Sequence, residues 1–144
     1  MEVVAKRYNK VLWLHAFYIL SGAGLITGGG FLIKESIPAA IVMFLIGGAT
    51  GFFGIFLTVL ALKTPNEAIR HDGKSLYFPD FSCKPWEVEV NFSTPSKETY
   101  GTLYVRAAGV ERKYRFVADV EKVCEALKAI KSRSKKERDK SVEE

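Results

Sequence analysis

Hydrophobic and polar positions divide the chain into an apolar first half and an alternating second half. One apolar run extends from Val11 to Ile33, with His15 as its only ionisable side chain, and a second, uncharged run extends from Ile37 to Leu62. A helix needs about 20 apolar residues to cross the hydrocarbon core of a bilayer, and both runs exceed that length. Only Lys34–Ser36 separates them. The pattern therefore predicts an antiparallel pair of transmembrane helices over 11–33 and 37–62.

Glycines are frequent in both runs, and the stretch Ser21–Gly30 resembles a phosphate-binding loop in composition. A dinucleotide fingerprint requires a strand before the glycines, and a Walker loop requires a following Gly-Lys-Ser/Thr. Neither context is present, so the sequence argues against nucleotide binding. Small residues four positions apart instead let two helix backbones approach closely, either within the hairpin or between copies of the chain. The obligatory contact within the hairpin favours the first alternative. The candidate packing residues are Gly24, Gly28, Gly47 and Gly51.

Basic residues near the ends of the apolar runs predict the orientation of the chain. Lysine and arginine concentrate on the cytoplasmic side of membrane helices. The two outer flanks contain Lys6, Arg7, Lys10, Lys63 and Arg70, whereas the connecting loop contains only Lys34. The first run exceeds a normal signal-peptide core and a second run follows at once, which indicates an uncleaved anchor. We expect a multi-pass protein of the inner membrane, with a cytoplasmic N-terminal flank (1–10) and a cytoplasmic C-terminal segment.

Period-two alternation replaces the apolar runs after Lys63. The stretch Pro85–Ser93 alternates in the way typical of a half-buried strand, and further strands are expected over 100–108 and 112–117. The inward positions expected in these strands are Trp86, Val88, Val90, Phe92, Leu103, Val105, Tyr114 and Phe116. Two short extended runs lie on either side of Asp72-Gly73 within 67–78, and this dipeptide predicts a hairpin turn between them. Such one-sided alternation is typical of an antiparallel sheet.

A C-terminal helix is predicted after Asp119, a favourable N-cap residue. Apolar residues follow it at helical spacing and form one stripe: Val120, Val123, Cys124, Leu127 and Ile130. Residues 132–144 are highly charged, have Val142 as their only apolar side chain, and are expected to be a disordered tail. The expected fold class is a membrane α-helical hairpin followed by a small α+β domain over 63–131, with an antiparallel sheet or partial barrel and one C-terminal helix.

Four stretches in this order resemble the bacterial PH-like domain of membrane proteins that carry it after a two-helix hairpin. They are EAIRHDGKSLYF, PWEVEVNFS, YGTLYVRAAGVERKYRFV and DVEKVCEAL, and the resemblance covers residues 10–131. It implies a seven-stranded PH-like barrel, whereas the alternation identifies only four or five strands. The remaining strands are either hidden in FPDFSCKP or absent. The resemblance supplies no catalytic residues.

No combination of residues indicates catalysis. Glu87 and Glu89 are expected on the polar face of a strand, and His71 is expected in an exposed turn. Cys83 and Cys124 lack the spacing of a metal site and are expected to be free thiols in a reducing compartment. We therefore expect no catalytic residue, no metal and no cofactor, and we do not expect an enzyme.

Binding is the expected activity, and a basic strand patch is the candidate contact for anionic lipid or a protein partner. The patch consists of Arg106, Arg112, Lys113 and Arg115. The mild basic excess of the C-terminal segment argues against nucleic acid, and no small-molecule substrate is evident. The expected partners are the lipid bilayer and either a protein partner or further copies of the chain. The alternative function is an oligomeric glycine-rich helix assembly that acts as a pore or as a transporter accessory subunit.

Overall fold

The chain forms two compact units in a computed structural model that describes residues 1–95 and 99–143. One unit is Asn9–Leu62, and the other combines Met1–Tyr8 with Lys63–Glu144. The described residues contain three α-helices and two antiparallel sheets. A helical hairpin and a small α+β domain are therefore both present, as the sequence predicts.

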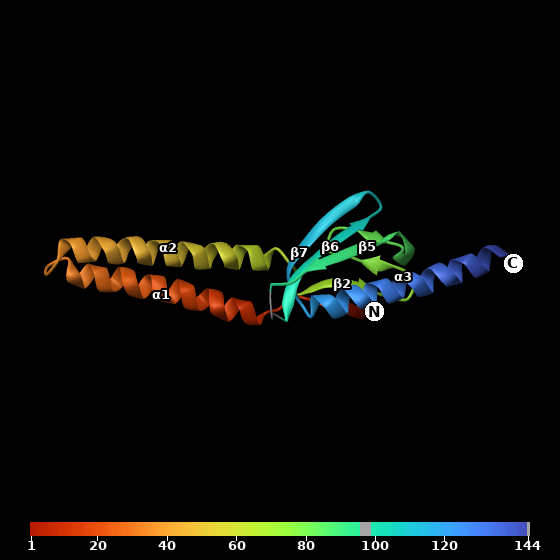
Figure 1. The fold of residues 1–144 in the computed structure, drawn as a ribbon, viewed down its shortest axis with the longest axis horizontal. Coiled ribbons are helices and arrows are strands. Elements are labelled where there is room, and N and C mark those ends of the chain that lie inside the picture. Colours follow the sequence, from red (N-terminus) through yellow and green to blue (C-terminus); the bar gives the residue numbers. More distant parts are fainter. Residues whose placement is uncertain (96–98, 144) are drawn as a thin grey trace. The chain divides into compact units, whose positions relative to one another are not determined.

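The hairpin unit is an antiparallel pair of helices (Figure 1), α1 (Lys10–Leu32) and α2 (Ile37–Leu62). Both helices are long and apolar enough to cross a membrane, and their bounds agree with the prediction to within one residue at each end. The carbonyl oxygen of Leu32 accepts hydrogen bonds from the N–H groups of Glu35 and Ser36 at 3.0 and 2.8 Å. These bonds close the short turn, and Ser36 begins the hydrogen-bonding of α2 by accepting from Ala40 at 3.0 Å.

Small residues seven positions apart form the contact between α1 and α2. The buried small residues are Gly22, Gly29, Ala40, Gly47, Gly54 and Ala61. A Cβ atom added at Gly22 would lie 2.6 Å from the carbonyl oxygen of Gly47 and 2.6 Å from the backbone nitrogen of Gly51. The two backbones are therefore in direct contact. A seven-residue repeat keeps such positions on one side of a helix that packs lengthwise against another.

The second unit is built from seven strands among the described residues. The first sheet has the order β1-β2-β3-β4 and the second has the order β5-β6-β7. Their bounds are β1 (Glu2–Lys6), β2 (Glu67–His71), β3 (Leu76–Tyr77), β4 (Ser82–Cys83), β5 (Glu89–Ser93), β6 (Tyr100–Ala107) and β7 (Val110–Ala118). An isolated bridge joins Arg7 to Val117, and the N–H of Tyr8 donates to the carbonyl oxygen of Phe116 at 2.6 Å. The chain just after β1 thus connects the first sheet to β7 of the second.

The strand β1 precedes the helical hairpin in the chain but pairs with β2, which follows it. Lys6 pairs with Glu67, and the N–H of Arg7 donates to the carbonyl oxygen of Asn66 at 3.1 Å. The flank predicted over 1–10 is therefore part of the domain as far as Tyr8. Irregular pairing on both sides of Ala5 disturbs the period-two pattern by which a strand is recognised.

The strand expected over Pro85–Ser93 is replaced at its start by a short 3₁₀-helix, η1 (Pro85–Glu87). Proline suits the first position of a helical turn because it has no N–H to satisfy. The carboxylate of Glu87 accepts a hydrogen bond from the N–H of Lys84 at 3.2 Å and fastens the turn. Regular pairing begins only at Glu89, so Trp86 does not share a strand face with Val90 and Phe92.

A β-bulge changes the inward positions of β7. Leu103 pairs with Tyr114 and Gly101 pairs with Val117, so one extra residue lies on β7 between these pairs. Phe116 has a φ of 55°, in the left-handed region. As a result Val117 is fully buried beside Tyr114, and Phe116 is only half-buried. The prediction that Phe116 shares the inward face with Tyr114 was therefore wrong, whereas the inward positions of Leu103 and Val105 in β6 are confirmed.

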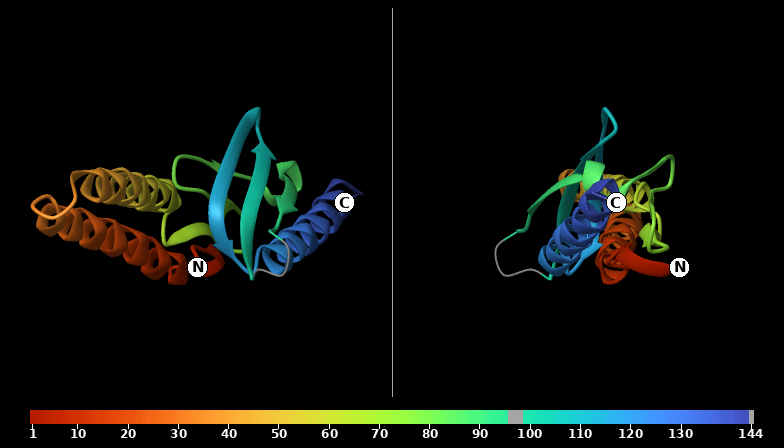
Figure 2. Two further views of the ribbon diagram at one scale, coloured as in Figure 1. Left: turned by 60° about the vertical axis from the view of Figure 1, so that its left-hand side comes forward. Right: turned by 90° about the vertical axis from the view of Figure 1, so that its right-hand side faces the viewer.

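The helix α3 (Val120–Glu143) packs against η1, β5, β6 and β1 (Figure 2). Its predicted stripe is confirmed: Val120, Val123, Cys124 and Leu127 are buried, and Ile130 is half-buried. The core beneath it also includes Ala5, Ile69, Leu76, Val88, Leu103, Val105 and Val117.

The last part of α3 differs from the disordered tail expected over 132–144. The helix continues to Glu143, because residues beyond the apolar stripe still contact the domain. The guanidinium of Arg138 lies 5.7 Å from the ring centroid of Trp86, a cation–π arrangement. The hydroxyl of Ser141 also donates to the carbonyl oxygen of Arg138 at 2.7 Å.

Candidate functional site

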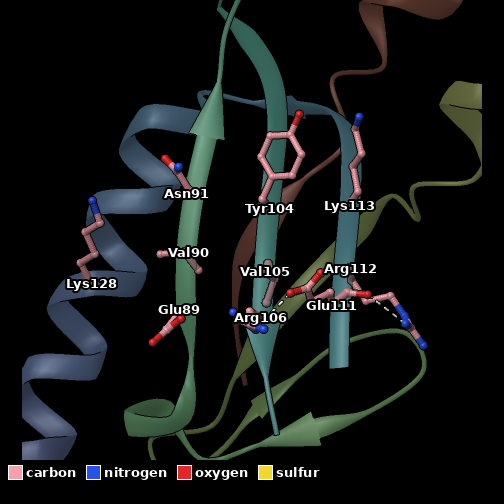
Figure 3. Close-up of a pocket in the computed structure, with 10 residues that line it drawn as sticks. All are labelled: Glu89, Val90, Asn91, Tyr104, Val105, Arg106, Glu111, Arg112, Lys113 and Lys128. Atoms are coloured by element: carbon pink, nitrogen blue, oxygen red, sulfur yellow. Dashed lines mark hydrogen bonds and ion pairs between the residues drawn. The ribbon is translucent and has the colours of Figure 1, made fainter. Parts of the chain in front are cut away.

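The outer face of the second sheet carries an open groove of about 630 Å³. Residues of β5, β6, β7 and α3 line it (Figure 3): Glu89, Val90, Asn91, Tyr104, Val105, Arg106, Glu111, Arg112, Lys113 and Lys128. We call it the sheet groove. It contains most of the basic residues that the sequence singled out, and it is the candidate contact surface.

Strand register places the polar side chains of the sheet groove in two rows. Leu103 and Val105 point into the core and are 0% and 2% exposed, so their neighbours Tyr104 and Arg106 point outward. Across the three strands, the first row is Asn91, Tyr104 and Lys113, and the second row is Glu89, Arg106 and Glu111. The rows run side by side across the sheet in Figure 3.

Contacts within each row hold the side chains in place. The Nζ atom of Lys113 lies 5.2 Å from the ring centroid of Tyr104, and the Nε atom of Arg106 lies 3.0 Å from Oε1 of Glu111. Both members of the ion pair are largely exposed, at 67% and 70%. Exposed pairs contribute little to stability and exchange readily with other charged partners. The groove therefore presents an aromatic ring, an amide and exchangeable charges.

The structure divides the predicted basic patch. Arg106 and Lys113 lie together on the outer face. Arg112 pairs with inward-pointing Val105 and so belongs to the opposite face of the strand, where its Nε atom lies 2.6 Å from Oδ2 of Asp80. Arg115 does not line the groove, and its backbone N–H donates to Oγ1 of Thr64 at 3.0 Å. Adjacent residues of a strand, such as Arg112 and Lys113, point to opposite faces of the sheet, so the sequence alone already argues against one patch that contains both. That all four contact a lipid or a partner stays a prediction.

The sheet groove is only weakly basic. On the outer face its lining contains the cations Arg106, Lys113 and Lys128 and the anions Glu89 and Glu111, so three positive charges minus two negative charges leave +1, because Arg112 is paired with Asp80 on the opposite face. Mixed charges of this kind suit a partner that carries both polar and acidic groups. Within 1–95 and 99–143, no cluster of three or more His, Cys, Asp or Glu side chains could hold a metal ion.

Outside the sheet groove, the cysteine thiols and the Tyr114 hydroxyl belong to the core of the domain. Burial, followed by the nearby Glu87 carboxylate, raises the pKa of the Cys83 thiol to about 11. Burial, followed by the Asp80 charge, raises the pKa of Tyr114 to about 12. Both cysteines are free and buried. With these raised pKa values the Cys83 thiol and the Tyr114 hydroxyl are poorly ionised near neutral pH and do not resemble activated nucleophiles.

The predicted Asp72-Gly73 turn is confirmed between β2 and β3, where His71 pairs with Leu76. Oδ1 of Asp72 accepts hydrogen bonds from the N–H groups of Lys74 and Ser75 at 2.9 and 2.8 Å. These backbone donors, followed by the Tyr77 hydroxyl, lower the pKa of Asp72 to about 2. The adjacent His71 is half-buried, so the prediction that it is exposed was wrong.

The four glycines predicted to pack helices have different surroundings. Gly47 lies at the centre of the α1–α2 contact, whereas a Cβ atom at Gly28 or Gly51 would meet only Met43 Cε at 3.0 Å or Gly22 Cα at 3.9 Å. A Cβ atom at Gly24 would meet nothing within 4 Å. Gly22, Gly29 and Gly54 also lie in the contact and were not predicted, although their seven-residue spacing is a signal present in the sequence.

Comparison of the chain with protein-family models, with curated proteins and with solved structures gives no significant match.

Proposed function

We propose that the chain is an integral protein of the bacterial inner membrane whose two-helix hairpin anchors a small cytoplasmic PH-like binding module. The module is a non-catalytic scaffold or regulator that contacts a protein partner or anionic lipid through the sheet groove. The observation that carries this proposal is the pairing of β1 with β2, because these neighbouring strands flank an exceptionally apolar hairpin in the chain.

The exposed side chains of the hairpin support membrane insertion. Large apolar residues cover the helix surfaces that do not pack on each other; Trp13, Phe31 and Phe52 are 81%, 79% and 72% exposed. Water-soluble proteins rarely expose such continuous apolar surface. In hydrocarbon the same surface is favourable, and close packing of small residues is a common way for membrane helices to associate.

The β1–β2 pair also bears on topology. Residues on both sides of the hairpin form one sheet, so both must lie on the same side of the membrane. Two crossings satisfy this requirement and one crossing does not. Together with the basic residues flanking the helices, this supports a location of both outer segments in the cytoplasm.

The number and order of strands support the PH-like interpretation. Sheets of four and three strands, followed by one helix, match the seven strands that the resemblance implies. The strands beyond the five that the sequence identifies are β1, from the N-terminal segment, and the short β4, which lies within FPDFSCKP.

The alternative of a pore is not favoured by the polar residues of the hairpin. The hydroxyl of Thr27 donates to the carbonyl oxygen of Ala23 at 2.9 Å, and that of Thr58 donates to the carbonyl oxygen of Gly54 at 2.8 Å. Both donors are thus satisfied within their own helices and do not need water or a transported polar group.

Thiol labelling tests the orientation of the chain. The native cysteines are buried, so single thiols are introduced at two exposed serines, Ser36→Cys in the helix connection and Ser132→Cys in α3. A membrane-impermeant reagent should label the first in intact cells and the second only after the cells are opened. The reverse result would overturn the proposed orientation.

Photocrosslinking tests the proposed binding surface. A benzophenone amino acid replaces Tyr104 in the full chain in native membranes, and the same replacement at the exposed Lys122 of α3 is the control. A protein or lipid adduct formed only at Tyr104, and lost in Arg106→Gln/Lys113→Gln, supports a contact through the sheet groove. Equal adducts at both positions, or none at Tyr104, would overturn it.

A further inference from the structure

We propose a second contact surface, an aromatic cluster of Tyr8, Tyr100 and Phe116 that lies in the headgroup layer of the bilayer. We call it the ring cluster. Its occupant is the anionic lipid surface itself. The inference rests on the proposed function in one respect, because it requires α1 to span the membrane.

Ring geometry and backbone contacts define the cluster. The rings of Tyr8 and Tyr100 are stacked with centroids 5.2 Å apart, and those of Tyr100 and Phe116 are tilted with centroids 5.8 Å apart. The N–H of Tyr8 donates to the carbonyl oxygen of Phe116, which occupies the bulge of β7. Three separate chain segments thus bring together rings that are all only half-buried.

The position of Tyr8 next to α1 determines the depth of the ring cluster relative to the membrane. Tyr8 precedes the first residue of α1, Lys10, by two positions, a chain length of at most about 7 Å. A residue so close to the end of a membrane helix belongs to the interface, where tyrosine rings with a polar tip are favoured. The ring of Tyr100 stacks on that of Tyr8, and the ring of Phe116 lies against that of Tyr100. Both rings therefore reach the same layer as Tyr8.

Basic residues accompany the rings. Lys6, Arg7, Lys10, Lys63 and Arg115 all lie in the segments next to the hairpin or beside Phe116 in β7. The nearest acid on β2, Glu67, is already paired with Arg70 at 2.5 Å. The guanidinium of Arg7 donates to the carbonyl oxygen of Thr64 at 3.2 Å, so both segments that lead to the helices are tied together. Cations near an anionic leaflet are attracted to it within a Debye length.

The covalent tether favours the bilayer over a separate partner as the occupant. A chain of a few residues holds the cluster near the lipid at a very high effective concentration, so even weak contacts are made. The sheet groove begins four residues farther along β6, at Tyr104, about 13 Å away along an extended strand. The two surfaces can therefore be tested separately.

Quenching by brominated lipid tests the proposal in the full chain. Vesicles contain phosphatidylcholine and phosphatidylglycerol with acyl chains brominated near the headgroup. In a Trp13→Phe/Trp86→Phe background, the probe is Tyr100→Trp and the control is Lys74→Trp, an exposed position in the turn between β2 and β3 that belongs to neither the ring cluster nor the sheet groove. Tyr8→Trp is a second probe if Tyr100→Trp does not fold. The chain with Trp86→Phe alone retains Trp13 in α1 and reports insertion of the hairpin.

We expect the bromolipid to quench the probe and Trp13 but to leave the control almost unchanged. A quenched Trp13 with an unquenched probe would overturn the ring-cluster proposal and leave the membrane anchor intact. Absence of quenching at both would overturn the anchor as well. Equal quenching of probe and control would show that the domain meets lipid without a defined surface and would overturn the ring-cluster proposal.

A second arm tests the contribution of charge. Lys6→Gln/Lys63→Gln removes two exposed cations next to the hairpin, and Lys74→Gln/Lys136→Gln removes two exposed cations elsewhere in the domain. With the first pair, probe quenching in anionic vesicles should fall toward its level in pure phosphatidylcholine. With the second pair it should not change. An equal effect of the two pairs would overturn a specific role for the cations beside the ring cluster.

Discussion

Replacing Gly22 by alanine should separate the two helices of the hairpin. The added Cβ atom would lie 2.6, 2.6 and 2.7 Å from three backbone atoms of α2. Carbon atoms in ordinary contact are about 3.5–4.0 Å from their neighbours, so the backbones must move apart by roughly 1 Å. A gap of that size forfeits a quarter to a half of the dispersion energy of the contacts it opens.

The expected loss is about 1–3 kcal/mol of the free energy of unfolding, the usual cost of inserting a group into a fully packed contact. Alanine also favours helix over glycine by up to about 1 kcal/mol, which partly masks the loss. Gly24→Ala is the matched control, because it has the same propensity effect on the same helix and its Cβ atom would meet nothing within 4 Å.

The assay is reversible unfolding of the full chain in mixed micelles, with the mole fraction of denaturing detergent as the variable. Gly22→Ala should unfold at a lower fraction than the native chain, and Gly24→Ala at an equal or higher one. Equal midpoints for the two variants would refute the close approach of the helix backbones at Gly22.

Three further predictions concern the domain. Ala5→Asp places a carboxylate at a position that is 0% exposed. It should lower the free energy of unfolding by about 3–5 kcal/mol, as an uncompensated buried charge does. Limited proteolysis should show faster cleavage of the domain in this variant than in Lys6→Asp. Asp72 has a pKa of about 2 against an ordinary 3.8, so its stabilising effect on the folded state is complete above about pH 4 and is lost as pH falls through 2. NMR titration of its carboxyl carbon should give a midpoint near 2. A midpoint near 4 would contradict the turn hydrogen bonds. The pKa of Cys83 is raised from 9.0 to about 11, so pH above 9.0 should favour the unfolded state, and a thiol reagent at neutral pH should label Cys83 only as denaturant unfolds the domain.

The parts of the fold that the sequence predicts are those with long, regular patterns. The apolar runs of the hairpin and the stripe of α3 extend over many residues, and β6 alternates without interruption, so local periodicity was sufficient. By contrast, β4 contains only two residues, too few to show a period. The partner of β1 is more than sixty positions away, beyond the hairpin, and no local signal connects them.

The candidate surfaces depend on details that period-two counting does not contain. The extra residue of the β7 bulge moves Phe116 off the inward face and next to Tyr100. The basic patch was identified from composition, so residues on opposite faces of one strand were grouped together. The last turns of α3 contact Trp86 through the side chain of Arg138, and that contact depends on the 3₁₀-helix that holds Trp86 in place.

The insertion of the hairpin between two paired strands has a consequence for biosynthesis. A ribosome completes β1 first, yet this strand has no pairing partner until both helices have been synthesised and, in the proposed membrane anchor, inserted, and β2 has emerged. An extended loop of this length would make the pairing entropically costly. A hairpin that is already inserted returns the chain close to where it began, so the pairing of Lys6 with Glu67 closes only a short path. Membrane insertion should therefore precede folding of the domain, and a nascent chain stalled before α2 should expose β1 to proteases and chaperones.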